Sequence, residues 1–277
     1  MSPEQSLHAI VLAIVQGITE FLPVSSSGHL VLVPWALGWE DFGFGFDIAL
    51  HVGTLVAVLV YFRREWVDLV KGLGSLLRFK SRNVDDSGGR KLALLVILGT
   101  IPAVIAGIAG KSAVEGVFRN PLIIGILLIL NGLLLLVAER TGRRILDILR
   151  LHWPDALIVG CAQILGLLPG ISRSGVTIGA GLARNMRREA SARFSFLLAA
   201  PLILGSGLLE SLDLIRGRET VDIPWALFLV GALVSGVTAA LCIAWLLRFL
   251  RRGTLLPFIV YCLALGVTVV AVRLVTS

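Results

Sequence analysis

Six long apolar runs constrain this chain more than any other feature of its sequence. They lie at residues 46–62, 92–110, 120–138, 190–212, 224–247 and 255–275. A transmembrane helix needs about 20 apolar residues to cross the ~30 Å core of a bilayer, so the shortest run has to be extended at its ends. The pattern predicts an all-α integral membrane protein with about six transmembrane helices.

The composition agrees with a membrane protein. Of the 277 residues, 56% are hydrophobic and only 16% are charged, whereas an average soluble domain has about 25% charged residues. The net charge of +7 is assigned to membrane-flanking loops, because no basic face with interleaved aromatic residues is present. We therefore expect membrane lipids as partners and no nucleic acid. Cys161, Cys242 and Cys262 stand singly in apolar sequence and are predicted to be small buried hydrophobic residues.

The distribution of Lys and Arg predicts the orientation in the membrane. Nineteen of the 25 cationic residues fall in four segments, at 63–91, 139–153, 184–193 and 248–252. Cytoplasmic loops carry an excess of positive charge, so these four segments are predicted to be cytoplasmic. Both chain ends are then predicted to lie outside.

Two further apolar segments, 7–38 and 154–183, are interrupted by polar residues, proline and glycine. Irregular backbone at membrane depth is tolerated only where it is buried in protein or lines a cavity. Each segment is therefore predicted to be a re-entrant helix–loop–helix. A pair of ordinary helices with a proline kink is the alternative.

The order of segments predicts an inverted-topology repeat within a single membrane domain, 1–277. Each unit has one re-entrant segment followed by three spans, with repeat one at about 1–140 and repeat two at about 150–277. Four pairs of identical residues are separated by 147 positions: Gln16 and Gln163, Ser25 and Ser172, Ser27 and Ser174, Gly28 and Gly175. Such repeats place a binding site near the midplane, at the ends of broken helices.

The second interrupted segment carries the guanidinium of Arg173 within apolar sequence. A cation at this depth needs an anionic partner, and the planar fork of Arg suits phosphate or carboxylate. Hydroxyl and backbone N–H donors surround it, so the predicted substrate-binding residues here are Ser172, Ser174, Gly175 and Thr177. An ion pair with Glu20 that only fastens the two halves together is the alternative.

The first interrupted segment places a carboxylate, three hydroxyls and an imidazole within a few residues. Gln16 and Glu20 share one helix face, and Glu20 is suited to ligate a divalent cation or to move a proton. Ser25, Ser26 and Ser27 offer hydroxyls that either cap a helix or act as a nucleophile, and His29 is able to attack phosphorus or to transfer a proton.

At these residues the sequence resembles the undecaprenyl pyrophosphate phosphatase family of bacteria, of the bacitracin-resistance type. One signature of that family is a (Glu/Gln)-x-x-x-Glu motif leading into P-V-S-S-(Ser/Thr)-G-H, and the other is P-G-x-S-R-S-G-x-T. Both are present, at Gln16 to His29 and at Pro169 to Thr177. Length, spacing and membrane layout extend the resemblance over nearly the whole chain.

The resemblance implies hydrolysis of a polyprenyl pyrophosphate lipid, undecaprenyl pyrophosphate, to the carrier lipid of cell-wall synthesis. It also implies a divalent cation (Mg²⁺ or Ca²⁺) and an active site on the outer face of the bacterial plasma membrane. Carried over by position, Glu20 is catalytic or metal-linked, Ser26 or His29 is the nucleophile and Arg173 binds the pyrophosphate. Gln16, where many members have an acid, is unable to act as a base here, which leaves that role to Glu20.

A second function follows from the predicted repeat rather than from the motifs. Inverted repeats with a midplane site are typical of transporters, so a flippase that returns the carrier lipid across the membrane is the alternative. The nucleophile and acid near His29 favour chemistry, because binding alone needs no such set. No feature of the sequence indicates an oligomeric state.

Overall fold

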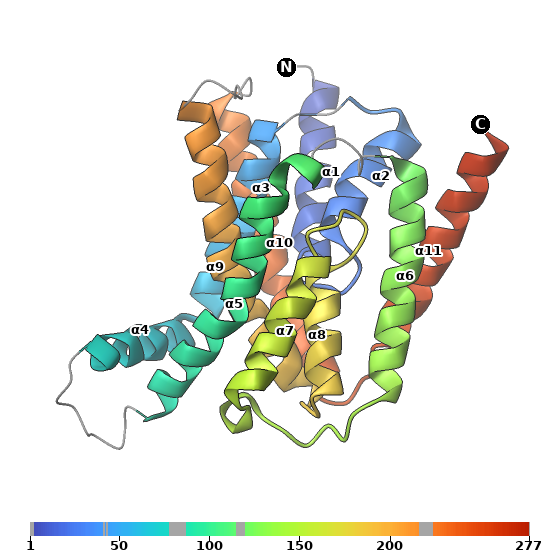
Figure 1. Cartoon of the computed structure of the whole chain (residues 1–277). Helices are drawn as coiled ribbons and strands as arrows, with labels where there is room; N and C mark the ends of the chain where they lie inside the picture. The colour runs from blue at the N-terminus through green and yellow to red at the C-terminus, as the bar shows by residue number, and fades with distance from the viewer. Residues whose placement is uncertain are drawn as a thin grey trace.

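The computed structural model describes residues 3–40, 42, 44–77, 87–114, 120–215 and 224–276, and these fold into α-helices (Figure 1). Most of the helices are packed alongside one another, and both ends of the chain lie at the same end of the molecule. The helices of the described residues are α1 (Pro3–Thr19), α2 (Ser26–Leu37), α3 (Phe44–Tyr61), α4 (Arg63–Leu77), α5 (Ser87–Val114), α6 (Pro121–Arg140), α7 (Trp153–Leu165), α8 (Arg173–Ala183), α9 (Arg188–Ile215), α10 (Trp225–Leu250) and α11 (Leu256–Val275).

The predicted transmembrane spans are confirmed as helices. Within the described ranges, α5, α6, α9, α10 and α11 are each long and apolar enough to cross a membrane. The sixth span is α3, which continues into α4 through a bend of 80°. The prediction of an all-helical membrane protein with about six spans is therefore confirmed.

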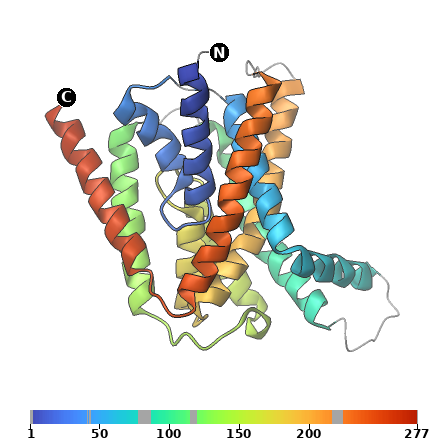
Figure 2. The ribbon, with the colours of Figure 1, turned by 180° about the vertical axis from the view of Figure 1, so that it is seen from behind.

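The two interrupted segments fold as pairs of short helices. Helices α7 and α8 have 13 and 11 residues, which is too short to cross a bilayer. Figures 1 and 2 show that α1 descends from the end that carries the chain termini and that α2 returns towards it, whereas α7 and α8 enter from the opposite end. The loops of the two pairs meet near the middle of the molecule.

Helix packing relates the two halves of the chain. Helix α1 packs on α10, and α7 packs on α5, as expected for corresponding elements of two repeats. Glycine permits very close approach at the α3–α10 and α5–α7 interfaces. A Cβ atom at Gly53 of α3 would lie 2.1 Å from the Ala232 carbonyl oxygen of α10, and one at Gly160 of α7 would lie 2.4 Å from the Gly99 oxygen of α5.

Helix α4 was not foreseen from the sequence. Segment 63–91 was interpreted only as a cationic loop, but residues 63–77 form a helix at the end of the molecule away from the chain termini (Figure 1). Leu69 and Gly72 are buried, while Val67 and Val70 on another face are exposed. Because charged residues are interleaved with the apolar ones, this amphipathic pattern was not recognised in the sequence. Such a pattern is typical of a helix at the membrane interface.

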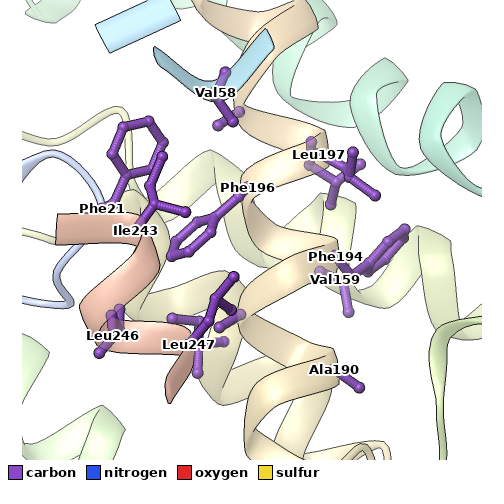
Figure 3. Close-up of a cluster of buried hydrophobic side chains, with 14 of the residues drawn as sticks. Phe21, Val58, Val159, Ala190, Phe194, Phe196, Leu197, Ile243, Leu246 and Leu247 are labelled. Carbon is purple, nitrogen blue, oxygen red and sulfur yellow. The ribbon is translucent and has the colours of Figure 1, made fainter. Parts of the chain in front are cut away.

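The main apolar core holds one of the re-entrant loops in place. Phe21, in the loop after α1, is fully buried, and its ring meets the ring of Phe196 of α9 edge to face at 5.1 Å (Figure 3). Val58 and Ile243 belong to the same cluster. This packing fixes the backbone on which Glu20 is carried. Cys242 and Cys262 are buried as predicted, but the prediction is wrong for Cys161, which is exposed.

Candidate functional site

The two re-entrant loops are joined through side chains of both repeats. Arg173 Nη2 lies 2.7 Å from Glu20 Oε1, and Ser174 Oγ donates a hydrogen bond to the Leu22 carbonyl at 2.9 Å. The ion pair between Arg173 and Glu20, which was the alternative to phosphate binding by Arg173, is thus present across 153 residues of sequence. The structure brings the two predicted motifs together into one site.

Glu20 is the centre of this site. It is 7% exposed, and besides Arg173 it accepts hydrogen bonds from Ser26 Oγ at 2.6 Å and from Gln16 Nε2 at 3.0 Å. His51 Nε2 of α3 lies 4.0 Å from the same carboxylate. A buried carboxylate requires such partners, because burial without them costs several kcal/mol.

Arg173 is the first residue of α8, and its side chain is only 12% exposed. Its second nitrogen, Nη1, donates to the Ala199 carbonyl of α9 at 3.2 Å. The guanidinium therefore connects the first loop, the second loop and α9. A planar donor fixed in this way is suited to bind phosphate with several hydrogen bonds.

The N-termini of two helices converge on the site. Ser25 caps α2, accepting from Gly28 N at 3.3 Å, and Ser172 caps α8, accepting from Gly175 N at 3.0 Å. Both helices start at the central loops and run outward in opposite directions (Figure 1). Helix N-termini attract anions through their N–H groups and the helix dipole, so this arrangement favours a negatively charged ligand.

The backbone at Ser25 is strained. Its φ angle is 72°, in the left-handed region that side chains other than glycine seldom adopt. Such residues cluster at functional sites, where surrounding contacts hold them. Here the strain turns the chain so that Ser26 and Ser27 follow at the start of α2.

A cavity of about 650 Å³ opens beside the loops, between the halves of α5 and α9 nearer the chain termini. Its polar end is formed by Glu20, Ser25, Ser26, Ser27, His51, Ser172 and Arg173. Its walls are mainly apolar and come from residues 103–110 of α5 and 202–209 of α9. A cavity with one polar end and apolar walls fits an amphipathic ligand with an anionic head group.

His29 is placed apart from the other predicted catalytic residues. It lies outside the residues that line the cavity, with Nδ1 2.7 Å from the Ser25 carbonyl and Nε2 2.6 Å from the Tyr261 hydroxyl of α11. A carbonyl oxygen only accepts, so Nδ1 carries the proton and Nε2 accepts from Tyr261. His29 therefore does not line the cavity that Glu20 lines.

Three other predicted binding residues lie behind the cavity wall. Ser174, Gly175 and Thr177 are in α8 but do not line the cavity. Thr177 Oγ1 pairs with Ser195 Oγ of α9 at 2.6 Å, so these residues join α8 to its neighbours. Gln16 is likewise fully buried, behind Glu20.

Two contributors to the site, Asn131 and His51, lie outside the two sequence motifs. Asn131 of α6 donates to the Pro23 carbonyl at 3.2 Å and accepts from Ser172 N at 3.1 Å, so a single side chain connects both loops. Its position as a single polar residue in an apolar run is the sequence feature that indicates such hydrogen bonds between helices. His51 of α3 lines the polar end of the cavity.

A divalent cation fits this site only together with ligand oxygens. Within the described ranges, no group of three or more His, Cys, Asp or Glu residues is arranged to hold a metal. Glu20 supplies one carboxylate, and the buried Gln16 Oε1 has no hydrogen-bond partner. Mg²⁺ in phosphate sites is commonly held by one or two carboxylates and the substrate phosphates, so Glu20 is the residue of the cavity lining that would hold it.

Fold and site together define a polytopic α-helical membrane protein with a polar site between two re-entrant helix pairs. The chain matches the family of bacitracin resistance protein BacA over residues 9–268. It therefore belongs to this family.

Several named relatives are similar to this chain over most of their length. An undecaprenyl-diphosphatase of Alcanivorax borkumensis is 48% identical over 260 residues, which cover 94% of this chain and 96% of the relative. One from Desulforudis audaxviator is 44% identical, covering 96% and 97% of the two chains. An undecaprenyl-diphosphatase 2 of Stutzerimonas stutzeri is 48% identical, covering 94% and 95%.

Proposed function

We propose that this protein is an undecaprenyl-diphosphatase, which hydrolyses undecaprenyl pyrophosphate to undecaprenyl phosphate and inorganic phosphate. The observation that carries the proposal is the cluster of Glu20, Ser26 and Arg173 at the polar end of an apolar cavity. Family membership and the names of its relatives support the same activity. The product is the carrier lipid of cell-wall synthesis, and its regeneration confers bacitracin resistance.

The pyrophosphate binds where the two helix N-termini converge. Arg173 donates from its fork, while hydroxyls of the first loop and N–H groups at the start of α2 and α8 supply further donors. These groups are held before the substrate arrives, by the ion pair with Glu20 and the bond to Ala199. Preorganised donors of this kind provide most of the stabilisation in phosphoryl transfer.

Ser26 is the nucleophile that the geometry favours. Its hydroxyl lines the cavity and donates to Glu20 at 2.6 Å. As Ser26 Oγ bonds to the terminal phosphorus, its proton passes to Glu20 and the bond to the bridging oxygen breaks, releasing undecaprenyl phosphate. Water then hydrolyses the phosphoserine. His29 supports Ser25 from behind, and it is the less favoured candidate because Tyr261 occupies its Nε2.

A divalent cation belongs to the proposed reaction. Glu20 would hold it together with phosphate oxygens, and when bound it offsets the negative charge of the pyrophosphate. Mg²⁺ and Ca²⁺ both prefer such oxygen ligands.

The active site is proposed to face the outer side of the bacterial plasma membrane. The cavity lies towards the end of the molecule that carries both chain termini, which the positive-inside rule places outside. The prenyl tail occupies the apolar part of the cavity.

The alternative remains a flippase for the same lipid. The arrangement of two helix pairs entering from opposite ends is the observation that favours it. A transporter needs donors for the phosphate but no hydroxyl bonded to a carboxylate, so the contact between Ser26 and Glu20 favours hydrolysis.

Phosphate release by the purified protein in detergent separates the two functions. We expect release from undecaprenyl pyrophosphate by the wild type, its loss with a chelator, and losses of at least about 100-fold in Ser26→Ala, Glu20→Gln and Arg173→Lys. Arg173→Lys keeps the charge but is unable to contact Glu20, Ala199 and phosphate at once.

Thermal unfolding of each variant is the control, since removing one partner of a buried ion pair also destabilises a protein. A folded wild type that releases no phosphate would contradict hydrolysis and leave the flippase. Full activity in folded Ser26→Ala would contradict the role of Ser26.

A further inference from the structure

The glycines of this protein fall into two groups with different surroundings. At Gly53 and Gly160 an added Cβ would collide with the backbone of another helix, so close packing explains these glycines. At Gly107 and Gly110 of α5 and Gly205 of α9, a Cβ would meet no atom within 4 Å. Packing therefore gives no reason for glycine at the latter three positions.

These three glycines all line the cavity beside the pyrophosphate site. They lie on facing helices, each at or beyond the middle of its helix, in the walls that lead away from the polar end. A glycine in a helix interior is less favourable than alanine because the backbone loses more entropy. What glycine provides here is space between the helices.

The space borders the surface that faces lipid. Ile108 of α5 is 61% exposed and Leu208 of α9 is 59% exposed, and both also contribute to the cavity lining. The same side chains therefore touch the cavity and the outer surface. The cavity thus continues sideways, between α5 and α9, towards the surrounding bilayer.

The size of the cavity requires such an exit for the substrate class proposed above. Pockets of roughly 300–1,000 Å³ bury a drug-sized ligand, and this one has about 650 Å³. It holds a pyrophosphate with the first isoprene units, whereas the rest of a long polyprenyl chain has no room inside. That remainder is apolar and has to lie in lipid.

We propose that Gly107, Gly110 and Gly205 form a lateral opening between α5 and α9, through which the polyprenyl tail of the bound substrate passes into the bilayer. The proposal rests on the proposed function and specifies how that site accepts a long lipid. The size of the side chains at these three positions determines the longest polyprenyl tail that a hydrolysed substrate can carry. The pyrophosphate and the reacting groups lie beyond the opening and are unaffected by it.

The test compares a long and a short substrate in the same variants. Gly107→Leu and Gly205→Leu add bulk at the opening, and Gly74→Leu on α4 is the matched control, since its Cβ also meets no atom within 4 Å but lies outside the cavity. For undecaprenyl pyrophosphate we expect kcat/KM to fall at least about tenfold in the first two variants. For farnesyl pyrophosphate we expect a change of less than about threefold, because a short tail does not reach the opening.

The alanine variants Gly107→Ala and Gly205→Ala keep the test valid if leucine impairs folding. They add a single methyl group to open space, so we expect an unfolding temperature at least equal to that of the wild type and a smaller loss that is again confined to the long substrate. Equal losses with both substrates, or no loss with either, would overturn the lateral opening. A wild type that hydrolyses neither substrate would instead overturn the proposed function on which it rests.

Discussion

At the scale of single residues, the site depends on side chains that hold one another rather than on any one reactive group. Glu20 has three hydrogen-bond donors, Arg173 has two acceptors on different elements, and Asn131 connects both loops. The hydroxyl of Ser26, the proposed nucleophile, is positioned by this set. His29 belongs to the supporting set by its contacts, with one nitrogen on Ser25 and the other on Tyr261.

This arrangement predicts different effects for the two partners of the His29 contact. His29→Ala removes the bond that fixes the Ser25 carbonyl and is expected to lower kcat more than about tenfold by displacing the serines. Tyr261→Phe removes one hydrogen bond of about 1 kcal/mol and leaves Nδ1 in place, so less than tenfold is expected. Phosphate release assays on both variants measure this, with thermal unfolding as the control. A larger loss in Tyr261→Phe than in His29→Ala would contradict the supporting role.

At the scale of elements, the helix interfaces depend on glycine where backbones approach most closely. Gly53 lies against the Ala232 carbonyl and the Ser235 hydroxyl of α10. Helix α3 also presents His51 to the cavity. The packing of α3 on α10 therefore determines the position of His51 in the cavity lining.

Gly53→Ala is expected to destabilise the protein by about 1–3 kcal/mol, because the added methyl group forces α3 and α10 apart. Gly74→Ala is the control, since nothing lies within 4 Å of that position, and an alanine there is expected to be neutral or slightly stabilising. Thermal unfolding in detergent compares the two. Equal unfolding temperatures would show that the interface adapts to the extra methyl group.

At the scale of the whole molecule, the two ends differ in charge. The described parts of the four cation-rich segments lie at one end, and both described chain ends lie at the other (Figure 1). The first end is held by ion pairs between helices, such as Arg193 with Glu65 at 2.8 Å and Arg251 with Glu189 at 3.2 Å. The cavity is on the opposite half.

The orientation can be measured with single cysteines in a Cys161→Ser background. Thr276→Cys lies beyond α11 at the end predicted to be outside, and Arg252→Cys lies beyond α10 at the cationic end; both positions are exposed. A membrane-impermeant maleimide applied to intact bacterial cells is expected to label only the first, and both after permeabilisation. Labelling of Arg252→Cys alone in intact cells would reverse the orientation and place the active site in the cytoplasm.

Local patterns in the sequence determined the class of protein and the two stretches that meet in the middle of the molecule. Apolar length predicted the spans because the bilayer fixes how long a transmembrane helix has to be. The cost of polar groups at membrane depth singled out the stretches around Glu20 and Arg173. Helix α4 was not predicted because its charged residues were interpreted only as orientation signals, although its apolar residues repeat with a helical period.

Only the tertiary structure decided which of these groups face one another. The sequence places Ser26 and His29 three positions apart, yet one lines the cavity and the other meets α11. It offers no distinction between Gly53, pressed against a neighbouring backbone, and Gly205, which borders open space. Local energetics determine which elements form, whereas the neighbours of a side chain depend on how distant helices pack, and that is decided by the fit of whole surfaces.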